Sequence, residues 1–340
     1  MDPNVVLPFL SSALSFAFAA LVFAQWRARR RPFQLLWTVG PLWYGISAGT
    51  EFLGGILGWS DPLYRAWYLI GALYVAAYLG AGTVYLLART RFGYFVAASV
   101  FVGGLFALAS QARLVREGRP APEAAVALVI GYATFAAITI AVATWRRREA
   151  AAHVTLAHLV VTSAAVAVLV LAAQLEPPGY AVDPATGVPV GSAIPGYLRV
   201  ASGPFNIAGA FTLVFGALFS AYVFMPKRKV LRPRVRVPVL AQALGALAVV
   251  VNLLASLPLA ARALARGELH SRVPATMLIA LGGFIPGITS GLNRFGITWS
   301  FYLGELLGVV LIFAGFLVST EVFARRTPAR TALAAERGTG

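Results

Sequence analysis

Long apolar runs separated by short polar breaks make up most of this chain. Each run is close to the roughly 20 residues that an α-helix needs to cross a hydrocarbon core of about 30 Å. The ten runs cover residues 5–26, 34–58, 63–88, 92–110, 124–145, 153–175, 200–225, 238–261, 273–291 and 298–323. Turn-forming stretches such as "SDP" and "EGRPAPE" lie between them. The pattern predicts an all-α polytopic membrane protein with about ten hydrophobic helical segments.

Composition agrees with this class. Apolar residues make up 59% of the chain and charged residues 12%, against about 25% charged residues in soluble domains. Residues 1–323 are therefore expected to form a single transmembrane domain, followed by a basic, disordered tail at 324–340. The one long loop, 176–196, is too short to fold alone.

The net charge of +16 does not indicate a nucleic-acid partner, because the arginines cluster at the ends of apolar runs, where they meet lipid headgroups. The clusters at 27–31, 89–91, 146–148 and 227–236 fall on the cytoplasmic side if the N-terminus is outside, so the bias in basic residues predicts an N-terminus outside. The loop 225–237 is expected to bind anionic headgroups on the cytoplasmic side. Its basic residues are Lys227, Arg228, Lys229, Arg232, Arg234 and Arg236.

The run at 273–291 complicates this topology. Ten crossings would place the tail arginines Arg325, Arg326 and Arg330 outside, whereas nine would place them inside. The run contains Pro286 and several glycines, so it is expected to be either a kinked helix or a re-entrant segment that returns to the outer face.

Two glutamates within apolar runs are the main candidates for chemistry, since a charge in hydrocarbon costs several kcal/mol unless it is paired or hydrated. Glu51 and Glu305 are interpreted as proton- or cation-handling groups, with Arg294 as a counter-charge. The polar lining of the same pathway would come from Asn206, Asn252 and Asn293. The alternative is that both glutamates are structural and bond to neighbouring helices.

Aromatic side chains offer a second candidate surface. Trp43, Tyr44, Tyr74 and Tyr78 lie deep in their segments, where they either line a ligand pocket or simply pack. A weak internal echo relates "YLIGALYVAAYLGAGTVYLLARTR" to "FNIAGAFTLVFGALFSAYVFMPKRK".

Several chemistries are disfavoured. The chain has no cysteine, no phosphate-binding G-x-x-x-x-G-K-[ST] and no H-E-x-x-H. His153 and His158 are expected at the membrane surface, and neither a metal site nor a cofactor is expected. These absences argue against an enzyme.

Three stretches, "YRAWYLIGALYVAAYLGAGTVYLLART", "SGPFNIAGAFTLVFGALFSAYVF" and "FYLGELLGVVLIFAGFLVS", resemble uncharacterised polytopic inner-membrane proteins of high-GC bacteria. The resemblance implies a multi-pass protein of the cell inner membrane and no particular activity. The residues themselves favour a secondary transporter or channel-like protein for a small or lipid-like solute. The alternatives are a receptor-like or structural membrane subunit and, less favoured, a membrane enzyme acting on lipid.

Overall fold

The computed structural model describes residues 2–177, 179–182, 189–232, 238–293 and 299–319. Helices form almost all of this part, which confirms the all-α fold class. Within the long loop lies one short antiparallel pair, β1 (Ala181–Val182) and β2 (Pro189–Val190). The helices are α1 (Pro3–Arg29), α2 (Pro32–Leu57), α3 (Asp61–Leu69), the π-helix η1 (Ile70–Tyr74), α4 (Val75–Leu86), α5 (Gly93–Arg116), α6 (Glu123–Arg146), α7 (Ala150–Ala172), the 3-10 helix η2 (Gly191–Ala193), α8 (Gly196–Gly203), the π-helix η3 (Pro204–Ala208), α9 (Gly209–Phe224), α10 (Pro238–Ala265), α11 (Arg272–Asn293) and α12 (Trp299–Val318).

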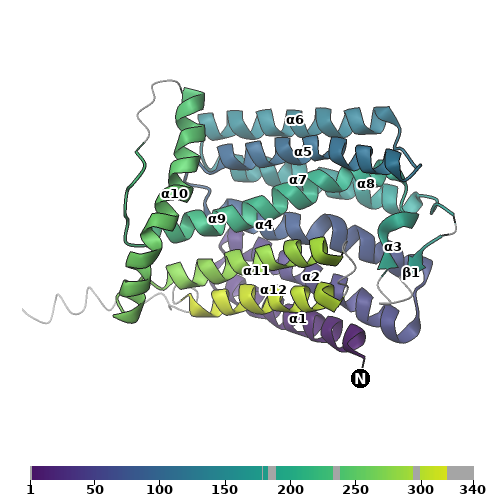
Figure 1. Cartoon of the computed structure of the whole chain (residues 1–340), viewed down its shortest axis with the longest axis horizontal. Helices are drawn as coiled ribbons and strands as arrows, with labels where there is room; N and C mark the ends of the chain where they lie inside the picture. Colours follow the sequence, from purple (N-terminus) through teal and green to yellow (C-terminus); the bar gives the residue numbers. More distant parts are fainter. Residues whose placement is uncertain (1, 178, 183–188, 233–237, 294–298, 320–340) are drawn as a thin grey trace, which may run out of the picture.

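The long helices lie side by side in a bundle (Figure 1). The helices α1, α2, α11 and α12 form one side, α5 to α8 form the other, and α4 and α9 lie between them. The α4–α9 contact is close because it has glycine on both helices. A Cβ added at Gly80 would lie 2.6 Å from the carbonyl oxygen of Gly209, so only glycine permits this approach.

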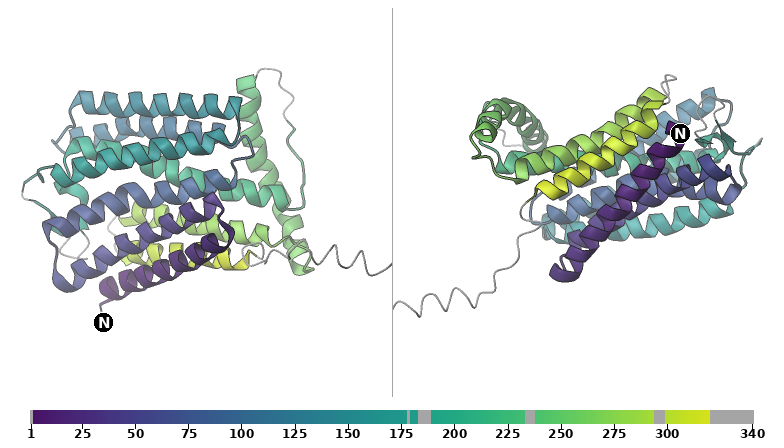
Figure 2. Two further views of the ribbon diagram at one scale, coloured as in Figure 1. Left: turned by 180° about the vertical axis from the view of Figure 1, so that it is seen from behind. Right: turned by 90° about the horizontal axis from the view of Figure 1, so that it is seen from below.

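The bundle has two ends that differ in the helix termini they carry. The N-terminal end is the one where α1 begins and α2 finishes, and the basic end is the one where α1 finishes at Arg29. The segments α3–η1–α4 and α8–η3–α9 each make one continuous pass from the N-terminal end to the basic end (Figures 1 and 2).

Helix α10 does not run with the bundle. It crosses the other helices steeply at the basic end, where α9 finishes and α11 begins (Figures 1 and 2). By length and apolar composition, nine helices of the described chain could cross a membrane. This set includes Leu247–Ala265 of α10 and leaves out α2. The direction of the helices indicates the opposite for these two, because α2 runs along the bundle axis and α10 does not. The protein is an integral, multi-pass membrane protein, but the segment predicted at 238–261 is not one of its parallel passes.

Hydrogen bonds from the preceding loop hold α10 in this position. Asn252 Oδ1 accepts from the backbone N–H groups of Val230 at 2.7 Å and Leu231 at 2.9 Å, and Asn252 Nδ2 donates to the Leu231 carbonyl at 2.9 Å. Ser256 Oγ accepts from the Arg228 N–H at 2.8 Å. The loop is therefore bound along α10, which a hydropathy pattern cannot reveal.

The segment 273–291 is not re-entrant. It lies within α11, one α-helix that continues through Pro286 to Asn293, so the expected break in backbone regularity is wrong for residues 282–293. Residues 294 and 295, and the tail 324–340, lie outside the described residues. Proline cannot donate to the Gly282 carbonyl, but that carbonyl is covered by α12, since a Cβ added at Gly308 would lie 3.0 Å from its oxygen. Close packing between two helices protects the freed carbonyl without a turn in the chain.

Charges are arranged differently at the two ends of the bundle. Arg262, Arg266 and Arg272, which a crossing α10 would place at the N-terminal end, lie at the basic end. Among the described residues, the basic end has one ion pair, Arg89–Glu149 at 3.0 Å. The N-terminal end has Arg65–Asp61, Arg113–Glu117 at 2.6 Å, Arg119–Glu176 at 2.8 Å and Arg199–Glu117 at 3.0 Å.

The ion pairs of Glu117 change the pKa of its carboxyl group. Partial burial by itself raises the pKa of the Glu117 carboxyl, but the hydrogen bonds and positive charges of Arg113 and Arg199 outweigh burial and hold the pKa below its usual value. The arginines of the N-terminal end are thus largely neutralised, whereas the basic end keeps its excess charge. The cytoplasmic location of the basic end stays a prediction, which rests on the number of Lys and Arg residues there.

Topology can be tested with single cysteines, because the natural chain has none. We expect Lys229→Cys and Glu268→Cys to react with a membrane-impermeant maleimide only after the membrane is permeabilised. Ser60→Cys should react in intact cells. All three positions are exposed, so reactivity depends on the side of the membrane. Positions 229 and 268 flank α10, and labelling of position 268 from the same side as position 60 would show that α10 crosses.

Candidate functional site: a buried carboxyl pair

Three residues lie at the same depth near the N-terminal end of the bundle. Glu51 is six residues before the end of α2, Trp67 is six residues after the start of α3, and Glu305 is six residues after the start of α12. At 1.5 Å per residue, each is about 9 Å from its helix end. The helix ends meet at this face, so equal spacing brings the three side chains to one level.

The carboxyl groups of Glu51 and Glu305 lie close enough to interact directly with each other. Glu51 is 2% exposed, and its Oε1 accepts a hydrogen bond from Trp67 Nε1 at 2.9 Å. The Oε2 atom of each glutamate is buried and has no donor from another described residue. Ionised carboxylates only accept hydrogen bonds, so a hydrogen bond between the two would require a proton on one of them.

Two tyrosines surround the pair. The Tyr44 hydroxyl donates to the backbone carbonyl of Glu305 at 2.7 Å and joins α2 to α12. The phenol of Tyr302, 2% exposed, is close enough to interact electrostatically with both carboxyl groups. Among the described residues no ion pair involves Glu51 or Glu305. The proposed counter-charge Arg294 lies outside the described residues, and so does the side chain of Asn293.

The other two asparagines do not join the glutamates. Asn252 holds the basic loop against α10, as described above. Asn206 lies in η3, and its Nδ2 donates to the Ala72 carbonyl of η1 at 2.7 Å. A π-helix shifts the backbone hydrogen bonds by one residue and leaves a carbonyl to be satisfied, which Asn206 does from the neighbouring segment. The two similar stretches of sequence, which begin at Tyr68 and Phe205, thus each include most or all of a π-helix. The two π-helices contact each other.

The deep aromatic residues pack together instead of lining an open pocket. Trp43 lies 5.3 Å from Tyr74 and 6.2 Å from Tyr78 between ring centroids, and Tyr74 lies 5.8 Å from Tyr78. The Tyr74 hydroxyl donates to the Ser163 carbonyl of α7 at 2.7 Å. Tyr44 is separate from this group and bonds at the carboxyl pair. These contacts agree with packing, the simpler of the two interpretations.

The histidines occupy two environments. His153 is exposed near the start of α7, as expected of a surface residue. The expectation is wrong for His158, whose ring nitrogens bond to Tyr132 and Thr139 of α6 at 2.9 and 2.8 Å. No single-sequence signal distinguishes the two residues, because both lie on one apolar helix.

Sequence reasoning missed Trp67 and Tyr302 at the carboxyl pair. The equal spacing of Glu51 and Trp67 from a short turn could have identified Trp67. In the described part of the chain, no three His, Asp or Glu side chains are grouped to hold a metal ion. No protein-family model, curated protein or solved structure matches the chain.

The Trp67 hydrogen bond can be tested by mutation. We expect Trp67→Phe to lower the free energy of unfolding by roughly 1–3 kcal/mol, because it leaves a buried carboxyl oxygen without its donor. The measurement is the heating temperature at which detergent-solubilised protein is lost from the monodisperse peak. Trp145→Phe, at a position 76% exposed, is the control. Equal loss of stability in the two variants would contradict a role for this bond.

Proposed function

We propose that this protein is a proton-coupled secondary transporter or channel-like protein for a small or lipid-like solute, in the inner membrane of a bacterium. The observation that carries the proposal is the contact between the carboxyl groups of Glu51, which is 2% exposed, and Glu305, whose Oε2 atom is buried. Intramembrane carboxyl groups are rare, and they mark proton or ion pathways in many membrane proteins.

The chemistry of the pair suits proton exchange. One proton shared by two carboxyl groups can leave toward the nearer surface, about 9 Å away along the helices. Its departure would leave two negative charges in contact, which is unfavourable at low dielectric. That repulsion would separate α2 from α12, unless a cation or a new proton enters. Protonation and helix contact are thus linked at one place.

The two central passes supply a second argument. Transporters commonly use discontinuous helices whose backbone departs from regular α geometry, and π-helices are frequent at functional sites. Here η1 and η3 interrupt neighbouring passes at the middle of the bundle. They adjoin α4 and α9, which separate the side with the carboxyl pair from the opposite side.

The basic loop and α10 fit the cytoplasmic membrane surface. Lys227, Arg228, Lys229 and Arg232 are exposed and would bind anionic headgroups, each contributing about 1 kcal/mol before screening. Arg234 and Arg236 lie outside the described residues. With α10 across the basic end, this loop is held at headgroup level instead of leading into another crossing.

A structural membrane subunit is the second candidate. It is favoured by a stripe on α10 formed by Leu247, Val250, Leu254 and Leu257, which are 52%, 40%, 58% and 38% exposed. Their spacing of three and four residues places them on one helix face, where a partner subunit could pack. In that case the carboxyl pair would be structural and would not exchange its proton with the bulk solution.

A pH jump on oriented proteoliposomes separates these functions. Movement of a proton between solution and the buried pair displaces charge within the membrane, so we expect wild-type protein on a solid-supported membrane to give a transient current. Glu51→Gln and Glu305→Gln should each reduce the displaced charge several-fold, because an amide keeps the hydrogen bond and loses the titration.

The matched control is Glu123→Gln, at an exposed carboxyl in the first turn of α6; it should leave the transient current unchanged. A wild-type protein that is silent over the range in which carboxyl groups titrate would favour the structural subunit. An equal current in all four proteins would show that the charge moves elsewhere.

A further inference from the structure

A cavity of about 370 Å³ lies on the side of the bundle away from the carboxyl pair. Its walls come from α4 to α9, and its volume is within the range of small-molecule sites. Leu128 of α6 and Val161 and Leu169 of α7 line it, although they are 72%, 61% and 46% exposed. The mouth therefore opens between α6 and α7, toward the hydrocarbon of the membrane.

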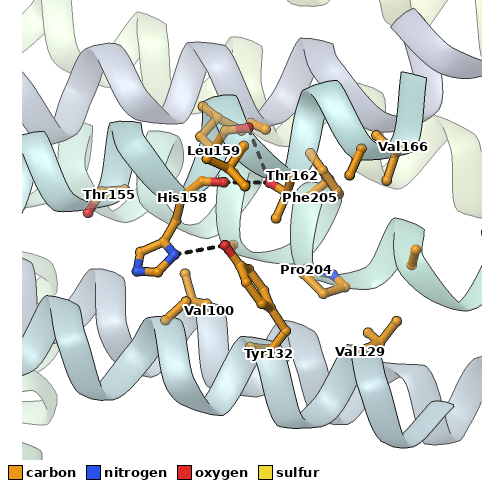
Figure 3. Close-up of a pocket in the computed structure, with 18 of the residues that line it drawn as sticks. Val100, Val129, Tyr132, Thr155, His158, Leu159, Thr162, Val166, Pro204 and Phe205 are labelled. Atoms are coloured by element: carbon orange, nitrogen blue, oxygen red, sulfur yellow. Dashed lines mark hydrogen bonds between the residues drawn. The ribbon is translucent and has the colours of Figure 1, made fainter. Parts of the chain in front are cut away.

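Most of the cavity wall is apolar, and Tyr132 and His158 form a hydrogen-bonded polar pair in it (Figure 3). The other hydroxyl-bearing residues of the described lining are Thr155, Thr162, Tyr197 and Thr212. Thr139 Oγ1 lies 2.9 Å from the Ala136 carbonyl oxygen and 2.8 Å from His158 Nε2, and His158 Nδ1 lies 2.9 Å from the Tyr132 hydroxyl. If Thr139 donates to Ala136, His158 carries its proton on Nε2 and Nδ1 accepts from Tyr132. The other tautomer of a neutral imidazole reverses both bonds.

The same network defines what the polar group can bind. In one tautomer of His158 the Tyr132 oxygen can accept a further hydrogen bond, and in the other its hydroxyl can donate one. Thr155 and Thr162 donate to backbone carbonyls, of Ala151 at 2.8 Å and His158 at 2.7 Å. A ligand hydroxyl beside Tyr132 suits both tautomers, because a hydroxyl both donates and accepts.

Anionic ligands do not suit this cavity. A carboxylate or phosphate needs several donors or a cation, yet the lining residues that the structure describes include no Lys, Arg, Asp or Glu, and an unpaired charge in such a site is costly. A plain hydrocarbon would fill the walls but would leave the Tyr132 oxygen unused.

We propose that this cavity binds an uncharged lipid alcohol, whose hydroxyl is hydrogen-bonded to Tyr132 and whose chain enters from the membrane between α6 and α7. The site goes beyond the proton function proposed above and stands on separate residues. Glu51→Gln and Glu305→Gln should leave the binding unchanged, so failure of one proposal does not affect the other.

Photo-crosslinking tests the site. Purified protein is incubated with a diazirine analogue of a sixteen-carbon alcohol, or with the matching carboxylic acid or alkane, and the labelled peptides are identified by mass spectrometry. We expect the alcohol to label α6 and α7 several-fold more than either analogue. Tyr132→Phe should lower labelling by the alcohol to the level of the alkane.

Neighbouring alanines on α7 give a matched pair. Both are exposed, but only Ala165 lines the cavity. Ala165→Phe should block the mouth and reduce labelling several-fold, whereas Ala164→Phe should not. Because both residues are exposed, neither substitution disturbs the core. Equal labelling by the acid and the alcohol, or an equal effect of the two substitutions, would overturn the proposal and indicate general adsorption of lipid.

Discussion

Every polar group inside an apolar bundle must find its partner within the protein, and this constraint shapes the molecule at each level. An unsatisfied backbone group or charge in hydrocarbon costs several kcal/mol. Arg65 is an example at the N-terminal end, where its guanidinium donates to the Val170 and Ala173 carbonyls near the end of α7 at 2.7 and 2.6 Å. Asn206 does the same for η1 in the middle of the bundle. The two glutamates meet the constraint only in part, because the Oε2 atom of each is buried without a hydrogen-bond partner among the described residues.

Sequence reasoning succeeded where the constraint is local. Apolar length predicts helices, and the isolation of Glu51 and Glu305 in apolar runs identifies both as unusual. Their contact could not be derived, because it depends on the direction of α11 and α12. That direction depends in turn on α10, whose apolar composition is the same whether it crosses or lies across the basic end. Hydrogen bonds from Asn252 to the loop decide the matter, and Asn252 looked instead like a pathway residue.

At Pro286 the sequence predicted a break in the helix that the structure does not have. Proline and glycine in an apolar run indicate a break only if the freed carbonyl has no other cover. Here α12 presents Gly308 to that carbonyl, and the glycines that lower helix preference also allow the neighbouring helix to approach. Composition alone cannot separate a broken helix from a closely packed one, because both require the same residues. The π-helices were missed for a related reason, since their sequences are as apolar as those of regular helices.

The choice of carboxyl groups at the pair argues for titration. Two glutamines would join α2 to α12 with the same hydrogen-bond geometry and without the risk of an uncompensated charge. Apolar side chains would fill the volume and are often neutral or stabilising in place of buried charged groups. A structural role alone therefore gives no physical reason for acids at 51 and 305. Acids differ from these alternatives in one property, which is that the proton can be released, and release changes the force between two helices from attraction to repulsion.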